Sequence, residues 1–304
     1  MKRLIAALLM LAGSASAQNM TPELCTESVA PLTTFADLPS VSSSVAADGR
    51  CTALDVVLYQ DEAQTLRADR VYWRLEDADR WIDDGLPPTR IEISAEGIWP
   101  EFKTGDVVLD YLLRVQNKRS GLSAELVLDW DEDEDDLLLE AAFLDFGPLG
   151  YIDASAKVTG VDLGSRFALR TSALTGKLIE LDIKVQSTGL FENYALLPLG
   201  TLVLRGEADP ARATAIIKSH AIDDIRALDS PILTEQSKDA LVALVEELPN
   251  PNGIFELSLR SEDGLGARSL GPAFLAGRLD TIADILDALS ESDIAINWTS
   301  LSKP

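Results

Sequence analysis

The chain has 304 residues, 50 acidic and 26 basic side chains, and a formal net charge of −24 at pH 7. This excess of acids argues against nucleic acid and anionic membrane surfaces as main partners, because both are bound through clusters of lysine and arginine. Hydrophobic residues make up 46% of the chain, which is enough for a core and excludes a disordered acidic tail.

Residues 1–17 predict a cleavable secretory signal peptide. The chain starts with a positive pair at residues 2–3, continues with an uncharged apolar run at residues 4–12, and has the pattern Ala-Ser-Ala at residues 15–17. The run is shorter than the roughly 18 residues that a retained membrane anchor requires. We therefore expect a periplasmic or secreted protein that has no transmembrane anchor after cleavage.

Cys25 and Cys51 are the only cysteines, and in an exported chain an isolated pair predicts one structural disulfide. A redox or metal site is the alternative, but the CxxC spacing is absent and no histidine is near. Residues 18–51 are rich in serine, threonine, proline and alanine, and they predict an irregular N-terminal segment that the disulfide holds in place.

Residues 52–205 predict an antiparallel β region, because apolar and polar residues alternate with a period of two. The clearest examples are Thr89 to Glu96 and Leu178 to Val185, in which one face of each strand is apolar and the other charged. Further strands are predicted at Leu54 to Gln60, Thr65 to Arg74, Asp106 to Val115, Leu122 to Leu128, Leu137 to Leu144 and Tyr151 to Val161. Short connections rich in turn-forming residues favour a meander.

Residues 206–304 predict a region of helices and strands that packs on the sheet. Asp209 caps a helix that begins at Pro210, and two further apolar repeats predict helices near Leu241 to Leu248 and Leu275 to Leu289. Two strand-like segments, 255–259 and 294–298, lie between and after them. The predicted fold class is α+β, mainly β: a curved antiparallel meander of about eight strands, with C-terminal helices packed on its apolar face.

An acidic run raises the question of a calcium site. Its members occupy the ligand positions of a calcium-binding loop; they are Asp129, Asp131, Asp133, Asp135 and Glu140. The sixth position, where such a loop needs glycine, is Glu134, and the flanking segments look like strands instead of helices. We therefore favour a solvated hairpin tip and expect no metal and no cofactor.

His220 is the only histidine, so any Ser-His-Asp machinery or histidine general base would have to use it. Asp224 lies one helical turn further on, but no nucleophile motif accompanies the pair. A position at the border of the buried stripe of its helix is the favoured interpretation, and no catalytic residue is assigned. Carboxylate chemistry is left open, because among 50 acids no pair stands out.

The predicted export, the successive amphipathic strands such as 151–161 and 178–185, and the closing helices and strands resemble AsmA-like and related β-rich proteins of the Gram-negative envelope. The resemblance extends over residues 54–298 as a pattern of elements and carries over no functional residue. It implies an envelope protein. Members of that class are much longer and commonly keep an N-terminal anchor, so the predicted release argues against a bridging lipid conduit.

The first functional hypothesis is a non-catalytic protein that binds a lipid or another apolar ligand in a groove on the sheet. Trp73, Trp81 and Trp99 could line such a groove, although core positions are favoured for them. The second hypothesis is an envelope scaffold without a small ligand. The third is a hydrolase that uses His220 or carboxylates. An open apolar sheet face would separate the first from the second.

Overall fold

The computed structural model describes residues 20–35, 42–119, 121–228, 230, 232–267, 286 and 289–301. The predicted signal peptide, residues 1–17, lies outside this part of the chain. So does most of the third predicted C-terminal helix, residues 275–289, of which residues 286 and 289 are described.

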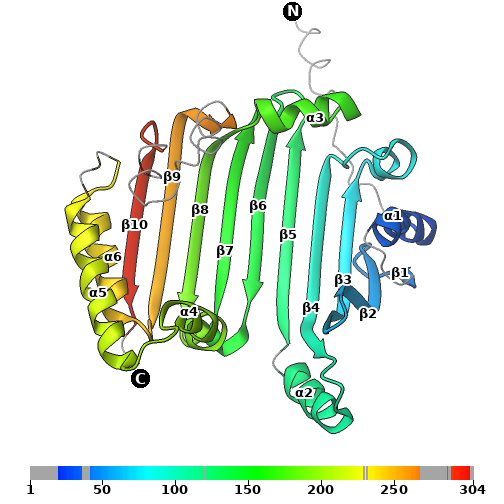
Figure 1. The fold of residues 1–304 in the computed structure, drawn as a ribbon. Helices are drawn as coiled ribbons and strands as arrows, with labels where there is room; N and C mark the ends of the chain where they lie inside the picture. The colour runs from blue at the N-terminus through cyan, green and yellow to red at the C-terminus, as the bar shows by residue number, and fades with distance from the viewer. Residues whose placement is uncertain are drawn as a thin grey trace, which may run out of the picture.

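Ten strands form one antiparallel sheet in which neighbours in sequence are neighbours in space, from β1 at one edge to β10 at the other (Figure 1). The strands are β1 (Ser43–Val45), β2 (Cys51–Gln60), β3 (Gln64–Glu76), β4 (Arg90–Phe102), β5 (Leu122–Asp131), β6 (Asp136–Asp145), β7 (Gly150–Thr159), β8 (Lys177–Ser187), β9 (Gly253–Gly266) and β10 (Asp293–Ser300). The predicted mainly β meander is confirmed, with ten strands in place of about eight.

Helices occur at the two ends of the sheet and at the strand connections (Figure 1). They are α1 (Pro22–Phe35), α2 (Val107–Arg119), α3 (Arg166–Thr175), α4 (Leu196–Val203), α5 (Pro210–Ala227) and α6 (Glu235–Glu247), with short helical turns η1 (Arg80–Asp84), η2 (Gly147–Leu149) and η3 (Phe191–Ala195). The N-terminus of α5 is as predicted: Asp209 accepts a hydrogen bond from the Arg212 backbone N–H, and Pro210 is the first helical residue.

Two predictions about local structure are wrong. The segment Asp106 to Val115 was expected to be a strand, but Val107–Arg119 is the helix α2. Residues 18–51 were expected to be irregular, but Pro22–Phe35 is the helix α1, which begins with proline at a position where the missing N–H costs nothing. Both helices lie against strands of the sheet, α1 beside β1 and β2, and α2 beside β4.

The strand register gathers apolar side chains on one side of the sheet, called here the apolar face. From β3 to β10 it comprises Val71, Trp73, Leu75, Ile91, Ile93, Ala95, Ala124, Leu126, Leu128, Trp130, Leu137, Leu139, Ala142, Leu144, Ile152, Ala154, Ala156, Val158, Leu178, Leu181, Ile183, Val185, Phe255, Leu257, Leu259, Ile294, Ile296 and Trp298. The side chains between them form the opposite, polar face.

A β-bulge keeps the pattern intact in β6. Leu128 pairs with Leu139 and Leu126 pairs with Ala142, so three residues on β6 are opposed to two on β5. Without the extra residue, Leu139 and Ala142 would point to opposite faces. The bulge therefore holds both on the apolar face and places Glu140 on the polar face.

Each end of the apolar face is covered by helices. At the β2–β4 end, α1 and η1 cover a cluster that includes Trp73 and the two cysteines. The Trp73 indole N–H donates to Ser28 Oγ at 3.0 Å, and that of Trp81 donates to the Ser28 carbonyl at 2.9 Å. At the other end, α6 packs on β10 over Ile294 and Ile296. The predicted packing of C-terminal helices on the apolar face is thus confirmed.

Candidate functional site

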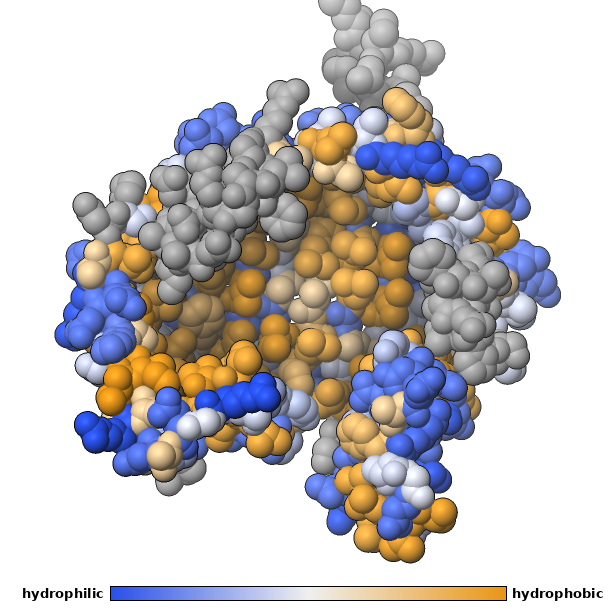
Figure 2. Space-filling view, viewed as in Figure 1, coloured by the Kyte–Doolittle hydropathy of each residue, from blue (hydrophilic) through white to orange (hydrophobic). Residues whose placement is uncertain are grey.

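The centre of the apolar face, on β5 to β8, is the candidate site. Its side chains are mostly half-buried, and Leu144 is 39% exposed, whereas Trp73, Ile294 and Ile296 at the covered ends are each at most 8% exposed. Among the described elements, the helices that pack on this face do so at its ends. Figure 2 shows apolar side chains on the floor of a hollow in this face. Contiguous exposed apolar surface of this kind is typical of ligand-binding grooves and of sites that contact proteins or membranes.

The β2–β4 end of the hollow contains a cavity of about 420 Å³ with an almost entirely apolar lining. It lies in the space between the sheet and the elements that cover it. Val29, Val56, Val71, Trp73, Leu75, Trp81, Pro87, Pro88, Ile91 and Ile93 contribute most of its walls. Its volume falls in the range of small-molecule pockets, about 300–1,000 Å³. Trp73 and Trp81 therefore belong both to the core and to the wall of a cavity. The sequence had left open whether these tryptophans pack in the core or line a groove, and they do both.

The edge of the sheet where the odd-numbered strands end, at the top of Figure 1, is held together by Arg80 and Trp130. The Trp130 indole N–H donates to the Val161 carbonyl at 2.7 Å, and the Arg80 guanidinium lies 4.8 Å from the ring centroid. Arg80 also donates to the Leu163 carbonyl at 2.7 Å. These contacts pack Val161 and Leu163 on Trp130, so the apolar floor is closed at this edge.

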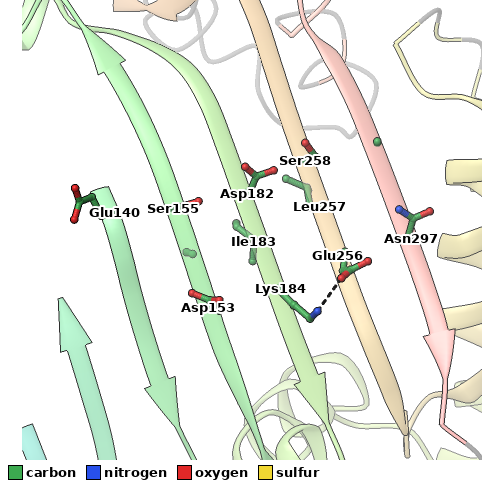
Figure 3. Close-up of a pocket in the computed structure, with 12 residues that line it drawn as sticks. Glu140, Asp153, Ser155, Asp182, Ile183, Lys184, Glu256, Leu257, Ser258 and Asn297 are labelled. Atoms are coloured by element: carbon green, nitrogen blue, oxygen red, sulfur yellow. Dashed lines mark ion pairs between the residues drawn. The ribbon is translucent and has the colours of Figure 1, made fainter. Parts of the chain in front are cut away.

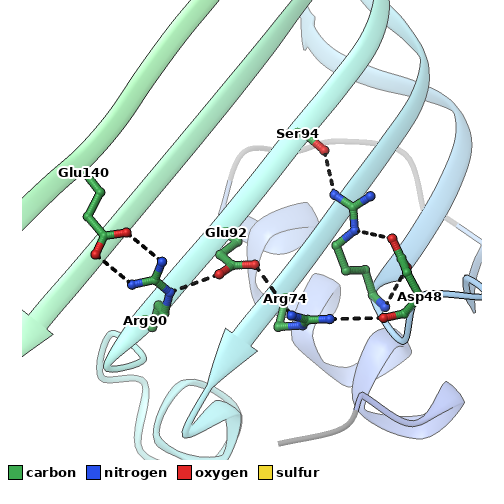
Figure 4. A network of polar contacts seen from close by, with 7 residues as sticks. Asp48, Arg74, Arg90, Glu92, Ser94 and Glu140 are labelled. Atoms are coloured by element: carbon green, nitrogen blue, oxygen red, sulfur yellow. Dashed lines mark hydrogen bonds and ion pairs between the residues drawn. The ribbon is translucent and has the colours of Figure 1, made fainter. Parts of the chain in front are cut away.

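The polar face has the opposite character, because cross-strand ion pairs run along it (Figure 4). Arg90 makes two hydrogen bonds to the Glu140 carboxylate, at 2.6 and 3.1 Å, and contacts Glu92 at 3.0 Å and Asp129 at 3.4 Å. The Arg90 guanidinium holds the pKa of Glu140 below its ordinary value. Charge is thereby concentrated on one face of the sheet and kept away from the other.

A second hollow, of about 420 Å³, lies on the polar face across β6 to β10 (Figure 3). Three carboxylates of its lining form ion pairs: Asp182 with Arg260 at 2.7 Å, Glu256 with Lys184 at 3.1 Å, and Glu140 with Arg90 at 2.6 Å. Arg260 lowers the pKa of Asp182, whereas a carboxylic acid that donates a proton in catalysis needs a raised pKa. The arrangement suits a solvated ion-pair ladder better than glycoside hydrolysis.

The acidic run forms the β5–β6 hairpin and does not converge on one point. Asp129 and Glu140 both contact Arg90, while Asp131 Oδ1 accepts hydrogen bonds from the backbone N–H groups of Asp133 and Glu134 at 3.0 and 3.2 Å. Asp135 adopts a left-handed backbone conformation, with φ of 54°, at the end of the turn. Within the described residues, no group of three or more potential metal ligands gathers.

His220 lies on an exposed face of α5, and so does Asp224. The expectation that the ring borders the buried stripe of the helix is therefore wrong, since Ile216 and Ile217 one turn earlier are also 46% and 41% exposed. Neither hollow of the sheet described above includes His220 in its lining.

The predicted disulfide is present and joins α1 to the first residue of β2, with Cα atoms of Cys25 and Cys51 5.4 Å apart. Both cysteines are fully buried at the covered end of the apolar face. The bridge therefore fixes the helix that forms one wall of the apolar cavity.

The fold and site define an open β-meander with one charged face and one partly uncovered apolar face. No model of a known protein family matches the chain, and no curated protein matches it in sequence. In the part of the chain that the structure describes, no helix combines the length and apolar character needed to cross a bilayer.

Proposed function

We propose that the protein binds a lipid or another apolar ligand on the centre of the apolar face and does not act as a catalyst. The observation that carries this proposal is the contrast in burial along one continuous surface: its ends are covered by α1 and α6, whereas the centre on β5 to β8 is half-exposed. A face that served only as core would have no reason to differ along its length.

The energetics support an apolar occupant. Burying a methylene group gains about 0.8 kcal/mol, so an acyl chain laid along several strands gains enough to offset its loss of freedom. The apolar cavity behind Trp73 and Trp81 gives such a chain an end point with almost no polar lining. The charged groups lie on the other face, so the ligand would meet no unpaired charge on the floor.

An envelope location is part of the same proposal. Residues 1–17 predict export, and a periplasmic protein with an open apolar face would meet envelope lipids or lipid-like metabolites. The resemblance of the strand pattern to AsmA-like envelope proteins is in keeping with this assignment.

Two adjacent alanines offer a matched test. Ala142 lies on the apolar face opposite Leu126, and Ala141 lies on the polar face opposite Val127. Glutamine at either position adds the same volume and an uncharged amide. Only at position 142 would the amide lie unpaired against an apolar ligand, at a cost of about 1–3 kcal/mol.

The experiment combines native mass spectrometry of protein purified from its envelope with titration of a fluorescent fatty acid. We expect a co-purifying apolar molecule and saturable binding, both weakened about tenfold or more by Ala142→Gln and unchanged by Ala141→Gln. A wild-type protein that carries no apolar molecule and does not bind the probe would favour the scaffold hypothesis. Equal loss in both variants would also contradict the proposal.

A further inference from the structure

Helix α2 is attached to the sheet by its polar side. Arg114 contacts Glu101 at 3.0 Å, Lys118 contacts Asp69 at 3.5 Å, and the Asn117 side chain donates to the Pro100 carbonyl at 2.9 Å. The residues of α2 that are less exposed are Asp110, Leu113 and Asn117, at the spacing of one helical stripe.

The apolar stripe of α2 faces away from the protein. Val108, Tyr111, Leu112 and Val115 follow the spacing i, i+3, i+4, i+7 and are 67%, 60%, 55% and 47% exposed. A surface helix ordinarily buries such a stripe against its own core. In α2 the apolar stripe points to solvent instead, so it can contact an apolar surface outside the protein.

Helix α4 adds a second apolar element at the same edge of the sheet. It follows β8 as α2 follows β4, and in this meander the even-numbered strands end at one edge, the lower one in Figure 1. Leu197 and Leu202 are 78% and 74% exposed. Between residues 193 and 206, Arg205 is the only charged side chain. Apolar surface is visible on both helices in Figure 2.

The α2 segment and the β5–β6 hairpin, which lie at opposite edges, differ in charge. Residues 103–119 contain four basic and two acidic side chains, and two of the bases, Arg114 and Lys118, form the ion pairs with the sheet that are described above. The opposite edge carries the β5–β6 hairpin, where residues 131–136 are six consecutive acids. An anionic surface would therefore be repelled by the hairpin more strongly than by the α2 segment, whose ends carry Lys103 and Arg119.

We infer that α2 and α4 together form a docking surface for a phospholipid bilayer that contains anionic lipid. Outward apolar side chains flanked by lysine and arginine are the features of helices that lie in the headgroup region. The net acidity of the chain argues against such a partner as a whole, but its densest acidic run, residues 131–136, lies at the opposite edge. The inference goes beyond ligand binding on the apolar face, because its residues lie on the connections at the edge and not on that face.

The test is flotation of the purified protein with vesicles of phosphatidylcholine, with and without phosphatidylglycerol. We expect binding that is stronger with the anionic lipid. The variants Tyr111→Ser/Leu112→Ser on α2 and Leu197→Ser/Leu202→Ser on α4 should each reduce the partition coefficient about tenfold or more. All four side chains are exposed, so circular dichroism should show an unchanged fold.

Helix α3 supplies the matched control, because Phe167 and Leu174 are 78% and 69% exposed at the opposite edge. The variant Phe167→Ser/Leu174→Ser should float as the wild type does. Loss of flotation in this control to the same extent, or a wild type that binds no vesicle, would overturn the inference. Self-association in analytical ultracentrifugation that the α2 variant abolishes would assign the surface to a second copy and overturn it as well.

The fatty-acid titration keeps this inference separate from the proposed function. The α2 and α4 variants should retain full affinity for the fatty acid, whereas Ala142→Gln should lose it and still float. Failure of flotation with intact fatty-acid binding would refute the docking surface alone.

Discussion

Replacing both cysteines by alanine should destabilise the protein by about 3.5 kcal/mol. The two residues are separated by 26 positions, and the chain-entropy relation gives this value for a loop of that length at 25 °C. Alanine is the suitable replacement because both sites are fully buried, so a serine hydroxyl would add an unpaired polar group. The loss should be concentrated where α1 covers the sheet.

Urea unfolding followed by tryptophan fluorescence measures the effect directly. Trp73 and Trp81 both donate hydrogen bonds to Ser28 on α1, so their emission reports whether this helix is attached. For a slope of about 1–3 kcal/mol per molar urea, the midpoint should fall by roughly 1 M or more. Wild-type protein in reductant should match the double variant, and the variant should not respond to reductant.

The reasoning would be refuted by a double variant with an unchanged midpoint. It would also be refuted if thiol labelling showed the wild-type bridge to be reduced while the urea midpoint stayed at its oxidised value. Either result would mean that α1 is held by its packing and the two tryptophan hydrogen bonds alone.

Three further predictions concern charged and titratable groups. Arg90→Met should make the free energy of unfolding fall less on acidification: the lowered pKa of Glu140 stabilises the fold above its ordinary value of 4.5, and this contribution is lost as the pH falls through the folded pKa. His220→Ala should change stability by less than about 0.5 kcal/mol in thermal unfolding, because the ring is exposed. Asparagine at the three aspartates of residues 131–135 should leave thermal stability in millimolar calcium unchanged; a calcium-dependent loss would reveal a site.

The strands could be predicted because each has one wet and one dry face. In Thr89 to Glu96 and Leu178 to Val185 the alternation follows directly from burial on one side, and the structure pairs both segments in the sheet. The bulge at Leu139 and Ala142 could not be predicted in this way, since Glu140 is the only polar residue of 137–143 and the two alanines after it fit either face.

The prediction of a strand at Asp106 to Val115, where the structure has α2, is wrong for a related reason. The apolar residues of this helix face solvent, so the rule that apolar residues face the core gave no help, and Val107 and Val108 favour a strand by propensity. The signal for a helix was in the polar residues: Asp110, Arg114 and Lys118 recur every four positions, and Arg114 and Lys118 contact the end of β4 and the neighbouring β3.

The sequence could predict the type of candidate site, an apolar sheet face, but not its position on the sheet. Alternation in each strand implied an apolar face, but whether that face is covered depends on where the connecting helices pack, and this is a property of the tertiary structure. The absence of a catalytic assignment rested on the single histidine, His220, which lies on an exposed face of α5.

The strictly sequential strand order has a consequence for how such a protein can change during evolution. Among the described strands, hydrogen bonding follows the order of the sequence from β1 to β10, so the sheet behaves as a one-dimensional array. Duplication or loss of one hairpin in the middle would lengthen or shorten the apolar floor by two strand spacings, about 9–10 Å, and leave both covered ends unchanged. The size of the apolar floor could therefore be altered by insertion or deletion of one hairpin, without other changes to the fold.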